Sequence, residues 1–142
     1  MSTLLLNTLT GKTSAGSIVV TGEGGSTTTN MQQGLNKVWC SFDQDSSGHP
    51  VYDSFNVAST SDGATGITVI AFTNNMTNDD YADVICATAE NESGFGGGMF
   101  SATNHVSGGQ KTTSQCGTDC RDDASNRRDN HDTRVILMGD LA

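Results

Sequence analysis

The 142-residue chain contains few charged side chains. Charged residues make up 16% of it, against about 25% in an ordinary soluble domain. Only 7 residues are Lys or Arg, and the formal net charge is -9. Because a phosphate backbone requires a basic protein surface, we expect no nucleic acid partner. An anionic membrane surface is an unsuitable partner for the same reason.

Long hydrophobic runs are also missing. The longest run near the N-terminus is Leu4-Leu5-Leu6, and no basic residue precedes it. A transmembrane helix needs roughly 18 or more apolar residues, and a signal peptide begins with a basic region. We therefore expect no membrane insertion and no secretory leader.

Residues that favour helices are scarce, since the chain has only three Glu and three Lys. Ser, Thr, Asn, Asp and Gly together make up just over half of the sequence. Short runs of Val, Ile and Thr between these turn-forming residues are typical of β-strands. The composition predicts a mainly β protein: an antiparallel β-sandwich body with an extended N-terminal arm and one short helix.

Residues 1–35 are expected to form the N-terminal attachment arm, with short strands over 4–10 and 17–21. A strand pair of this size cannot enclose a core and is marginal in water. The arm must therefore lie on the body, on sister chains or on another protein. The apolar residues expected to make this attachment are Leu4, Leu5, Leu6, Leu9, Ile18 and Val20.

The body is expected to span residues 36–142. A helix of two or three turns at most is predicted within 28–38, with Thr29 or Asn30 as its cap. Asp62-Gly63 is typical of a tight turn, and residues 92–133 read as a long polar loop. Strands are predicted over 38–42, 51–57, 66–72, 81–87 and 134–139, with a further short strand over 98–102.

Two segments match ligand-binding motifs only in part. Gly11-Lys12-Thr13 is similar to the end of a phosphate-binding loop, but the first Gly of that motif is replaced by Leu6. Residues 43–48 match the first half of a calcium loop. The twelfth position of that loop is Ser54 and not a bidentate Glu. A turn after a strand and a hairpin turn are the better interpretations.

The sequence predicts no catalytic site, no metal site and no cofactor, although two segments leave metal binding as a lesser alternative. His49, His105 and His131 are available as bases, but no Ser lies in a Gly-x-Ser-x-Gly elbow. Residues 119–132 mix Asp with Arg, which leaves three interpretations: a divalent ion site, ion pairs across a subunit interface, or a solvated loop. The solvated loop is the default.

The four cysteines divide into two kinds. Cys116 and Cys120 lie in the polar segment. They could form a disulfide, remain two free thiols, or bind a metal together with His131 or His105. The disulfide is the favoured interpretation. Cys40 and Cys86 lie in predicted strands and are expected to be buried as small apolar residues.

Several stretches together resemble structural proteins of tailed bacteriophages, marine ones especially. Residues 1–4 and 7–13 are similar to the start of short proteins of this class. Gln33–Trp39, Phe42, Asp53–Val57, Phe72–Met76 and Tyr81 resemble a module of their fibre-like proteins. The resemblance covers most of residues 1–90 and the last strand, while residues 92–133 do not follow it.

The resemblance implies a β-rich homotrimer on the virion surface. Its N-terminal segment would attach to capsid or tail proteins, and its body would face outward as a short fibre, spike or capsid decoration. No catalytic set is implied. A carbohydrate-binding β-sandwich for host-surface glycans is the alternative, with Trp39, Tyr52 and Tyr81 as stacking surfaces. A secreted disulfide-stabilised domain is a third hypothesis, which the absence of a leader disfavours.

Overall fold

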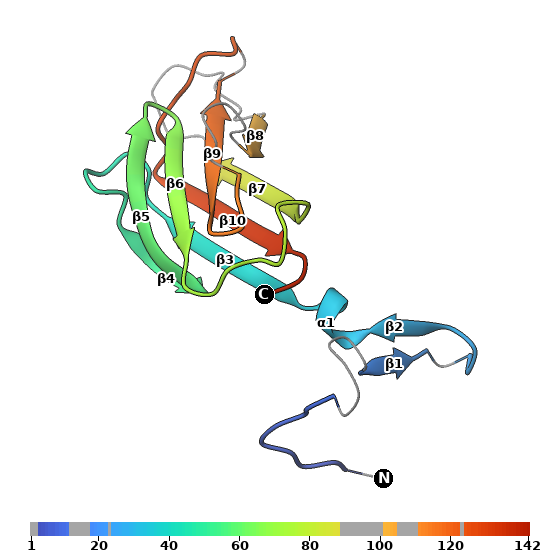
Figure 1. Cartoon of the computed structure of the whole chain (residues 1–142). Helices are drawn as coiled ribbons and strands as arrows, with labels where there is room; N and C mark the ends of the chain where they lie inside the picture. Colours follow the sequence, from blue (N-terminus) through green and yellow to red (C-terminus); the bar gives the residue numbers. More distant parts are fainter. Residues whose placement is uncertain (1–2, 12–17, 23, 89–100, 105–110, 123) are drawn as a thin grey trace. The chain divides into compact units, whose positions relative to one another are not determined.

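The fold was described from a computed structural model of the chain. The described residues are 3–11, 18–22, 24–88, 101–104, 111–122 and 124–142, with the backbone alone for Thr88 and residues 101–104. The chain divides into two compact units, Met1–Leu35 and Asn36–Ala142 (Figure 1). The boundary falls at the end of the residues expected to form the arm. The expected mainly β fold class is confirmed.

The first unit contains one hairpin and one helical turn. Strands β1 (Val19–Thr21) and β2 (Thr28–Asn30) pair antiparallel. Helix α1 (Met31–Gly34) follows directly, and the side chain of Asn30 caps it by accepting a 3.2 Å hydrogen bond from the Gln33 N–H. The helix is shorter than expected because residues 36–42 are a strand, and residues 4–10 form no strand. In the described part of the chain, no helix is long and apolar enough to cross a membrane.

The second unit is a sandwich of two four-stranded antiparallel sheets (Figure 1). The last strand of the chain, β10, lies between β3 and β7 in the first sheet. In order across that sheet the strands are β4 (Val51–Phe55), β3 (Asn36–Phe42), β10 (Asp132–Met138) and β7 (Ala82–Thr88). The second sheet has β5 (Val57–Ala64), β6 (Ile67–Phe72), β9 (Gln115–Arg121) and β8 (Ser101–Asn104).

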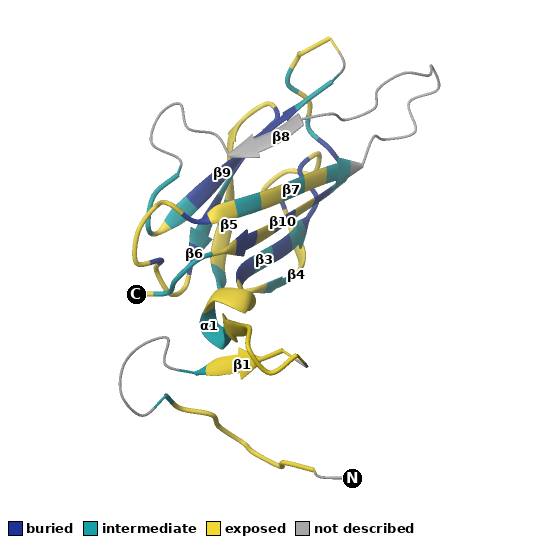
Figure 2. Cartoon of the chain, turned by 90° about the vertical axis from the view of Figure 1, so that its right-hand side faces the viewer, coloured by how far each residue is buried: buried dark blue, intermediate teal, exposed yellow. Residues whose placement is uncertain are grey.

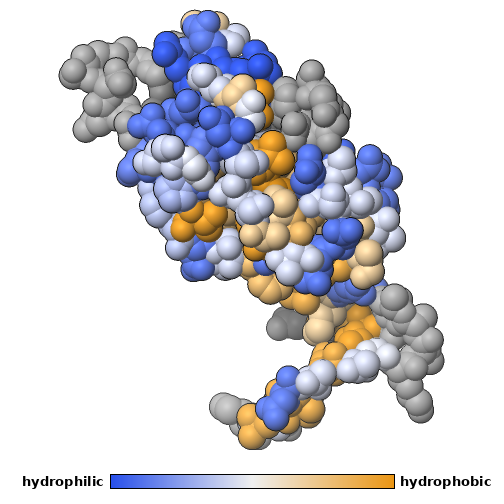
Figure 3. Space-filling view, turned by 60° about the vertical axis from the view of Figure 1, so that its left-hand side comes forward, coloured by the Kyte–Doolittle hydropathy of each residue, from blue (hydrophilic) through white to orange (hydrophobic). Residues whose placement is uncertain are grey.

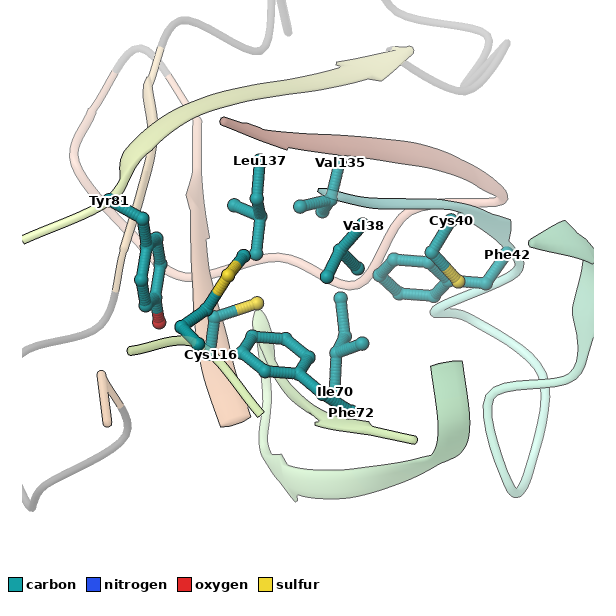
Figure 4. Packing of buried hydrophobic residues seen from close by; sticks show 10 residues of the cluster. Val38, Cys40, Phe42, Ile70, Phe72, Tyr81, Cys116, Val135 and Leu137 are labelled. Atoms are coloured by element: carbon teal, nitrogen blue, oxygen red, sulfur yellow. The ribbon is translucent and has the colours of Figure 1, made fainter. Parts of the chain in front are cut away.

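The hydrophobic core lies between the two sheets. Figure 4 shows Val38, Val135 and Leu137 of the first sheet facing Ile70 and Cys116 of the second. The burial pattern of β10 alternates strictly between inward and outward residues (Figure 2). Such alternation is expected for a strand with one face on the core. The core cluster consists of Val38, Cys40, Phe42, Ile70, Phe72, Met76, Tyr81, Cys116, Val135 and Leu137.

Two expectations about the body are wrong. Residues 92–133 are not one long loop, because β8 and β9 both lie within them. The hydrophobicity pattern of the sequence does not predict β9, because the buried positions of this strand include the polar Thr118 and Asp119. Asp62-Gly63 does not form the turn of the next hairpin. Both residues belong to β5, and the chain turns at Gly66, whose φ is 73°.

Candidate functional site

The first candidate surface is the set of apolar side chains in the N-terminal unit. Leu4 is 79% exposed and Leu5 is 87% exposed, while Leu6, Leu9 and Val20 are each at least half exposed. Ile18 is half-buried, and no described residue of Met1–Leu35 is buried. Figure 2 colours this unit mostly as exposed, and Figure 3 shows hydrophobic atoms on the surface of the N-terminal segment. The described residues of this unit form no core that could bury these side chains.

The second candidate surface is the outer face of the sheet that contains β3 and β10. Trp39 lies opposite Phe55 of β4 and opposite Ile136 of β10, and Ile136 lies opposite Val84 of β7. Directly opposed residues point to the same face of a sheet. Phe55 is 52% exposed, Val84 is 54% exposed and Ile136 is 38% exposed, while Trp39 is half-buried. We call Phe55, Trp39, Ile136 and Val84 the apolar row.

The apolar row could not be predicted from the sequence, because a row across a sheet joins residues that are far apart in the chain. A partial signal was present in β10, where four apolar residues follow one another from Val135 to Met138. A strand with only one buried face is expected to alternate apolar with polar residues. The apolar outward positions, Ile136 and Met138, therefore indicate a second covered face.

The three aromatic residues expected to bind glycan do not form one surface. Tyr81 is only 3% exposed and belongs to the core, where its hydroxyl donates a 3.0 Å hydrogen bond to the Gln115 carbonyl. It packs edge-to-face against Phe72. Tyr52 is exposed and its hydroxyl donates to the His131 carbonyl at 3.1 Å, while Trp39 belongs to the apolar row. The role expected for Tyr81 is therefore wrong.

The expected disulfide between Cys116 and Cys120 is also wrong, since all four cysteines are free. The two residues lie four positions apart in the same strand, which separates their Cα atoms by about 13 Å. A disulfide requires Cα atoms within about 7 Å. Burial raises the pKa of the Cys40 and Cys116 thiols to about 12 and that of Cys120 to about 11. Cys86, expected to be buried, is exposed on β7.

A polar cluster closes the turn between β3 and β4. The buried Asp43 carboxylate accepts hydrogen bonds from the Asp45 N–H at 2.9 Å, the Ser46 N–H at 3.0 Å and the Ser46 hydroxyl at 2.6 Å. It also lies 3.1 Å from Nδ1 of His131. Desolvation acts to raise the pKa of Asp43, but these hydrogen bonds and the His131 charge outweigh it and hold that pKa below its usual value.

This cluster has the contacts of a structural turn. The Asp43 carboxylate lies between the Ser46 hydroxyl and His131, whereas a catalytic triad places the imidazole between hydroxyl and carboxylate. The Asp43 carboxylate accepts N–H groups two and three residues further along the chain, as the side chain of an Asx turn does. Strands β3 and β4 pair antiparallel on either side of it. The expected hairpin turn is confirmed.

His49 lies between a hydroxyl and a carboxylate, with its Nδ1 2.7 Å from the Thr68 hydroxyl and its Nε2 3.9 Å from an Asp62 carboxylate oxygen. Thr68 is fully buried, so its hydroxyl is closed to a substrate. His105, like Lys12 and Thr13, lies outside the described residues. Among the described residues, no group of three or more His, Cys, Asp or Glu side chains is placed to hold a metal ion.

Ion pairs within the chain hold the segment that follows β9. Asp119 is 6% exposed and accepts paired hydrogen bonds from two guanidinium groups, at 2.9 Å from Arg121 and 3.1 Å from Arg127. Arg128 pairs with Asp122 at 3.0 Å. Bidentate arginine–carboxylate pairs fix geometry as well as charge. The default interpretation of residues 119–132 as a solvated loop is therefore wrong for Asp119–Arg121, which belong to β9. Most of the described residues from 122 to 131 are irregular and exposed or half-buried, as that interpretation expects.

We expect the folded chain to lose stability in acid through Asp119. Desolvation acts to raise the pKa of Asp119, but the hydrogen bonds and charges of Arg127 and Arg121 outweigh it, so the pKa lies far below its ordinary value. A carboxyl group with a lowered folded-state pKa stabilises the fold above its unfolded pKa, and this contribution is lost as the pH falls through the folded-state pKa. The free energy of unfolding should therefore decrease below about pH 5.

Urea unfolding of the wild type and of Asp119→Asn, at neutral pH and at a series of acidic pH values, tests this expectation. The variant should be less stable at neutral pH and should lose less stability in acid, because it lacks the titrating group. An equal acid dependence in the two proteins would show that Asp119 does not carry the effect.

Comparisons of the chain with protein-family models, with curated proteins and with solved structures found no match. The fold and the exposed surfaces themselves describe the class of protein. The chain is an antiparallel β-sandwich that presents two apolar surfaces, one in its N-terminal unit and one on a sheet face. Both surfaces have the composition of protein contacts, because exposed apolar patches of this kind mark interaction sites.

Proposed function

We propose that the chain is a non-enzymatic structural protein of a bacteriophage virion, docked by its N-terminal unit and displaying the sandwich outward. The single observation that carries the proposal is the exposure of Leu4, Leu5, Leu6 and Leu9 in a unit that buries none of its described residues. The sandwich, by contrast, has a core of its own. The resemblance of several sequence stretches to phage fibre-like proteins supports the assignment to a virion.

The expected partners are capsid or tail proteins and further copies of the chain, in a homotrimer on the particle surface. Full burial of an aliphatic side chain contributes about 1.5–3 kcal/mol. The six apolar residues expected to make the attachment would together contribute on the order of 10 kcal/mol before the entropic cost of association.

The decisive experiment is rebinding of purified full-length chain to virions that lack it, measured by co-sedimentation. We expect Leu5→Asp/Leu9→Asp to lose binding, because two charges would have to be buried without partners. The sandwich should keep its far-UV circular dichroism and its unfolding midpoint, since both leucines are more than half exposed.

The matched control is Thr8→Asp/Thr10→Asp. It adds the same two charges to exposed positions of the same segment and removes no large apolar side chain. Wild-type binding by this control, together with loss by the leucine variant, would assign attachment to the leucines. If the leucine variant bound virions as well as the wild type does, the proposal would be contradicted.

Binding of host-surface glycan by the sandwich is the second candidate function. With Tyr81 in the core, it rests on the exposed Tyr52 and the half-buried Trp39. Tyr52 has polar neighbours, since the ring of His131 lies 6.3 Å away and Asp53 follows it in the chain. A sugar needs such hydrogen-bonding groups beside an aromatic ring.

A further inference from the structure

We propose that the outer face of the sheet β4-β3-β10-β7 joins copies of this chain, with the apolar row of one copy packed on the apolar row of a second copy. This inference goes beyond the proposed function, because attachment through the N-terminal unit leaves open which surface joins the copies. It does not depend on that attachment, since the two surfaces share no residue.

The geometry of the face suits a second sheet. Neighbouring strands lie about 4.8 Å apart, so the apolar row crosses four strands over roughly 14 Å. Met138 is 38% exposed and lies opposite the exposed Ala82, two positions along β10 and β7 from the pair Ile136 and Val84. This second pair widens the apolar area. Two sheets that pack face to face lie about 10 Å apart with interdigitating side chains. A second copy offers a surface of the same width and composition.

The charges beside the apolar row are complementary to those of a second copy. A second row of directly opposed outward residues runs across the same four strands, beside the apolar row. It consists of Asp53 on β4, Ser41 on β3, Arg134 on β10 and Cys86 on β7. A two-fold rotation about an axis parallel to the strands places β10 of one copy over β3 of the other. Arg134 of each copy then lies over Ser41, next to Asp53, of the other copy. The same operation repeats this pairing, so the contact is self-complementary. A two-fold contact joins copies in pairs and does not by itself form the homotrimer implied by the resemblance.

The net charge of the chain also favours this face as the contact. The chain carries a formal net charge of -9, so most of its surfaces would repel a second copy. Among the described strand residues that point outward from this sheet and are not buried, the charged ones are Asp53, Asp132 and Arg134. Arg134 pairs with Asp132 on its own strand. Close approach at this face therefore meets little net repulsion.

The composition of the row favours protein over glycan as the occupant. The nearest neighbours of Trp39 in the row are Phe55 and Ile136, and Val84 continues it. The side chains of Phe55, Ile136 and Val84 can neither donate nor accept a hydrogen bond, and the indole N–H of Trp39 is the one polar group of the row. A sugar bound here would leave hydroxyl groups unpaired against an apolar surface, which costs binding free energy. A second apolar row has no such groups.

Light scattering after size exclusion, on the full-length chain over a wide range of concentrations, tests the inference. The wild type should give an even multiple of the 14.8 kDa chain mass, because the two-fold contact joins copies in pairs. Phe55→Glu/Val84→Glu should give the mass of one chain, with the dissociation constant raised by at least about 100-fold, because two unpaired charges on each copy would be buried. Far-UV circular dichroism should be unchanged, since both residues are more than half exposed.

Ser59→Glu/Ser61→Glu is the matched control. It adds the same charges at exposed positions of β5, opposite outward-facing residues of β6 in the other sheet. Its mass should equal that of the wild type. Cys86 supplies a second readout, because it is exposed on the proposed contact face while Cys40, Cys116 and Cys120 are buried. Its modification by a thiol reagent should slow as the wild type is concentrated, but not in Phe55→Glu/Val84→Glu.

The inference is overturned by a wild type that stays a single chain at every concentration, or by a Phe55→Glu/Val84→Glu variant that keeps the wild-type mass. If Leu5→Asp/Leu9→Asp dissociated the copies instead, the contact between copies would lie in the N-terminal unit. The proposal of virion attachment would not be affected by that result. A wild-type monomer that binds host polysaccharide, with binding lost in Phe55→Glu/Val84→Glu, would reassign the face to glycan.

Discussion

Replacing Gly66 by Ala should destabilise the sandwich by about 3 kcal/mol or more. Gly66 has a φ of 73°, in the left-handed region where a side chain costs roughly 1–2 kcal/mol. A Cβ at this position would lie 2.6 Å from the Cys120 carbonyl oxygen and 3.0 Å from the Arg128 nitrogen, both of them backbone atoms. Neither can move freely, because the Cys120 N–H donates to the Gly66 carbonyl at 2.8 Å and the Arg128 N–H to the Cys120 carbonyl at 3.1 Å.

Gly48→Ala is the matched control for this prediction. Gly48 has a φ of 82°, but a Cβ there would meet no atom within 4 Å. The control therefore carries the conformational cost without the collision, and should lose only about 1–2 kcal/mol. Urea unfolding of both variants separates the conformational cost of a positive φ from the cost of the collision with backbone atoms. Equal losses would show that the contact between the β5–β6 turn and β9 is looser than the structure indicates.

Replacing Phe42 by Ala should cost about 3–5 kcal/mol of unfolding free energy. Phe42 is fully buried at the end of β3, opposite Thr133 of β10 and Val51 of β4. Removing the ring loses its transfer free energy and leaves a cavity between the sheets, which the surrounding strands can fill only in part. Because a domain of this size has only about 5–15 kcal/mol of stability in total, the variant should unfold at a much lower temperature.

Phe55→Ala is the control for Phe42→Ala. It removes the same ring from the neighbouring strand of the same sheet, where 52% of the residue is exposed. At a dilution that gives the mass of one chain, we expect a loss of about 1 kcal/mol or less. Calorimetry and urea unfolding on both variants measure the difference. Comparable losses would contradict the assignment of the core to the inward face of β3.

The strands that the sequence predicted best are those with long apolar runs. The runs around Ile70 and Val135 became β6 and β10, because a strand buried on one or both faces needs such residues. The run over 51–57 was predicted as one strand but contains two, β4 and β5, which belong to different sheets. The chain crosses between the sheets at Asn56, whose φ is 60° and whose side chain donates to the Lys37 and Asn74 carbonyls.

Strand β9 could not be predicted, because its stability lies in partners that are distant in sequence. Its inward residue Thr118 accepts hydrogen bonds from the Gln44 amide and the Thr68 N–H. Its outward residue Asp119 is covered by two arginines, one of them eight residues away. Read in order, these residues look like a polar loop. The buried polar groups are acceptable only because each finds a partner.

The sequence by itself determined the fold class, the short N-terminal unit with its leucines, and the acidic net charge. These properties follow from composition and local patterning, which the printed order of residues contains in full. Only the tertiary structure decided that the cysteines stay free, that Tyr81 lies in the core, and that Phe55, Trp39, Ile136 and Val84 form a row. Each of those depends on strand register, which pairs residues up to about a hundred positions apart and cannot be read from neighbours in the chain.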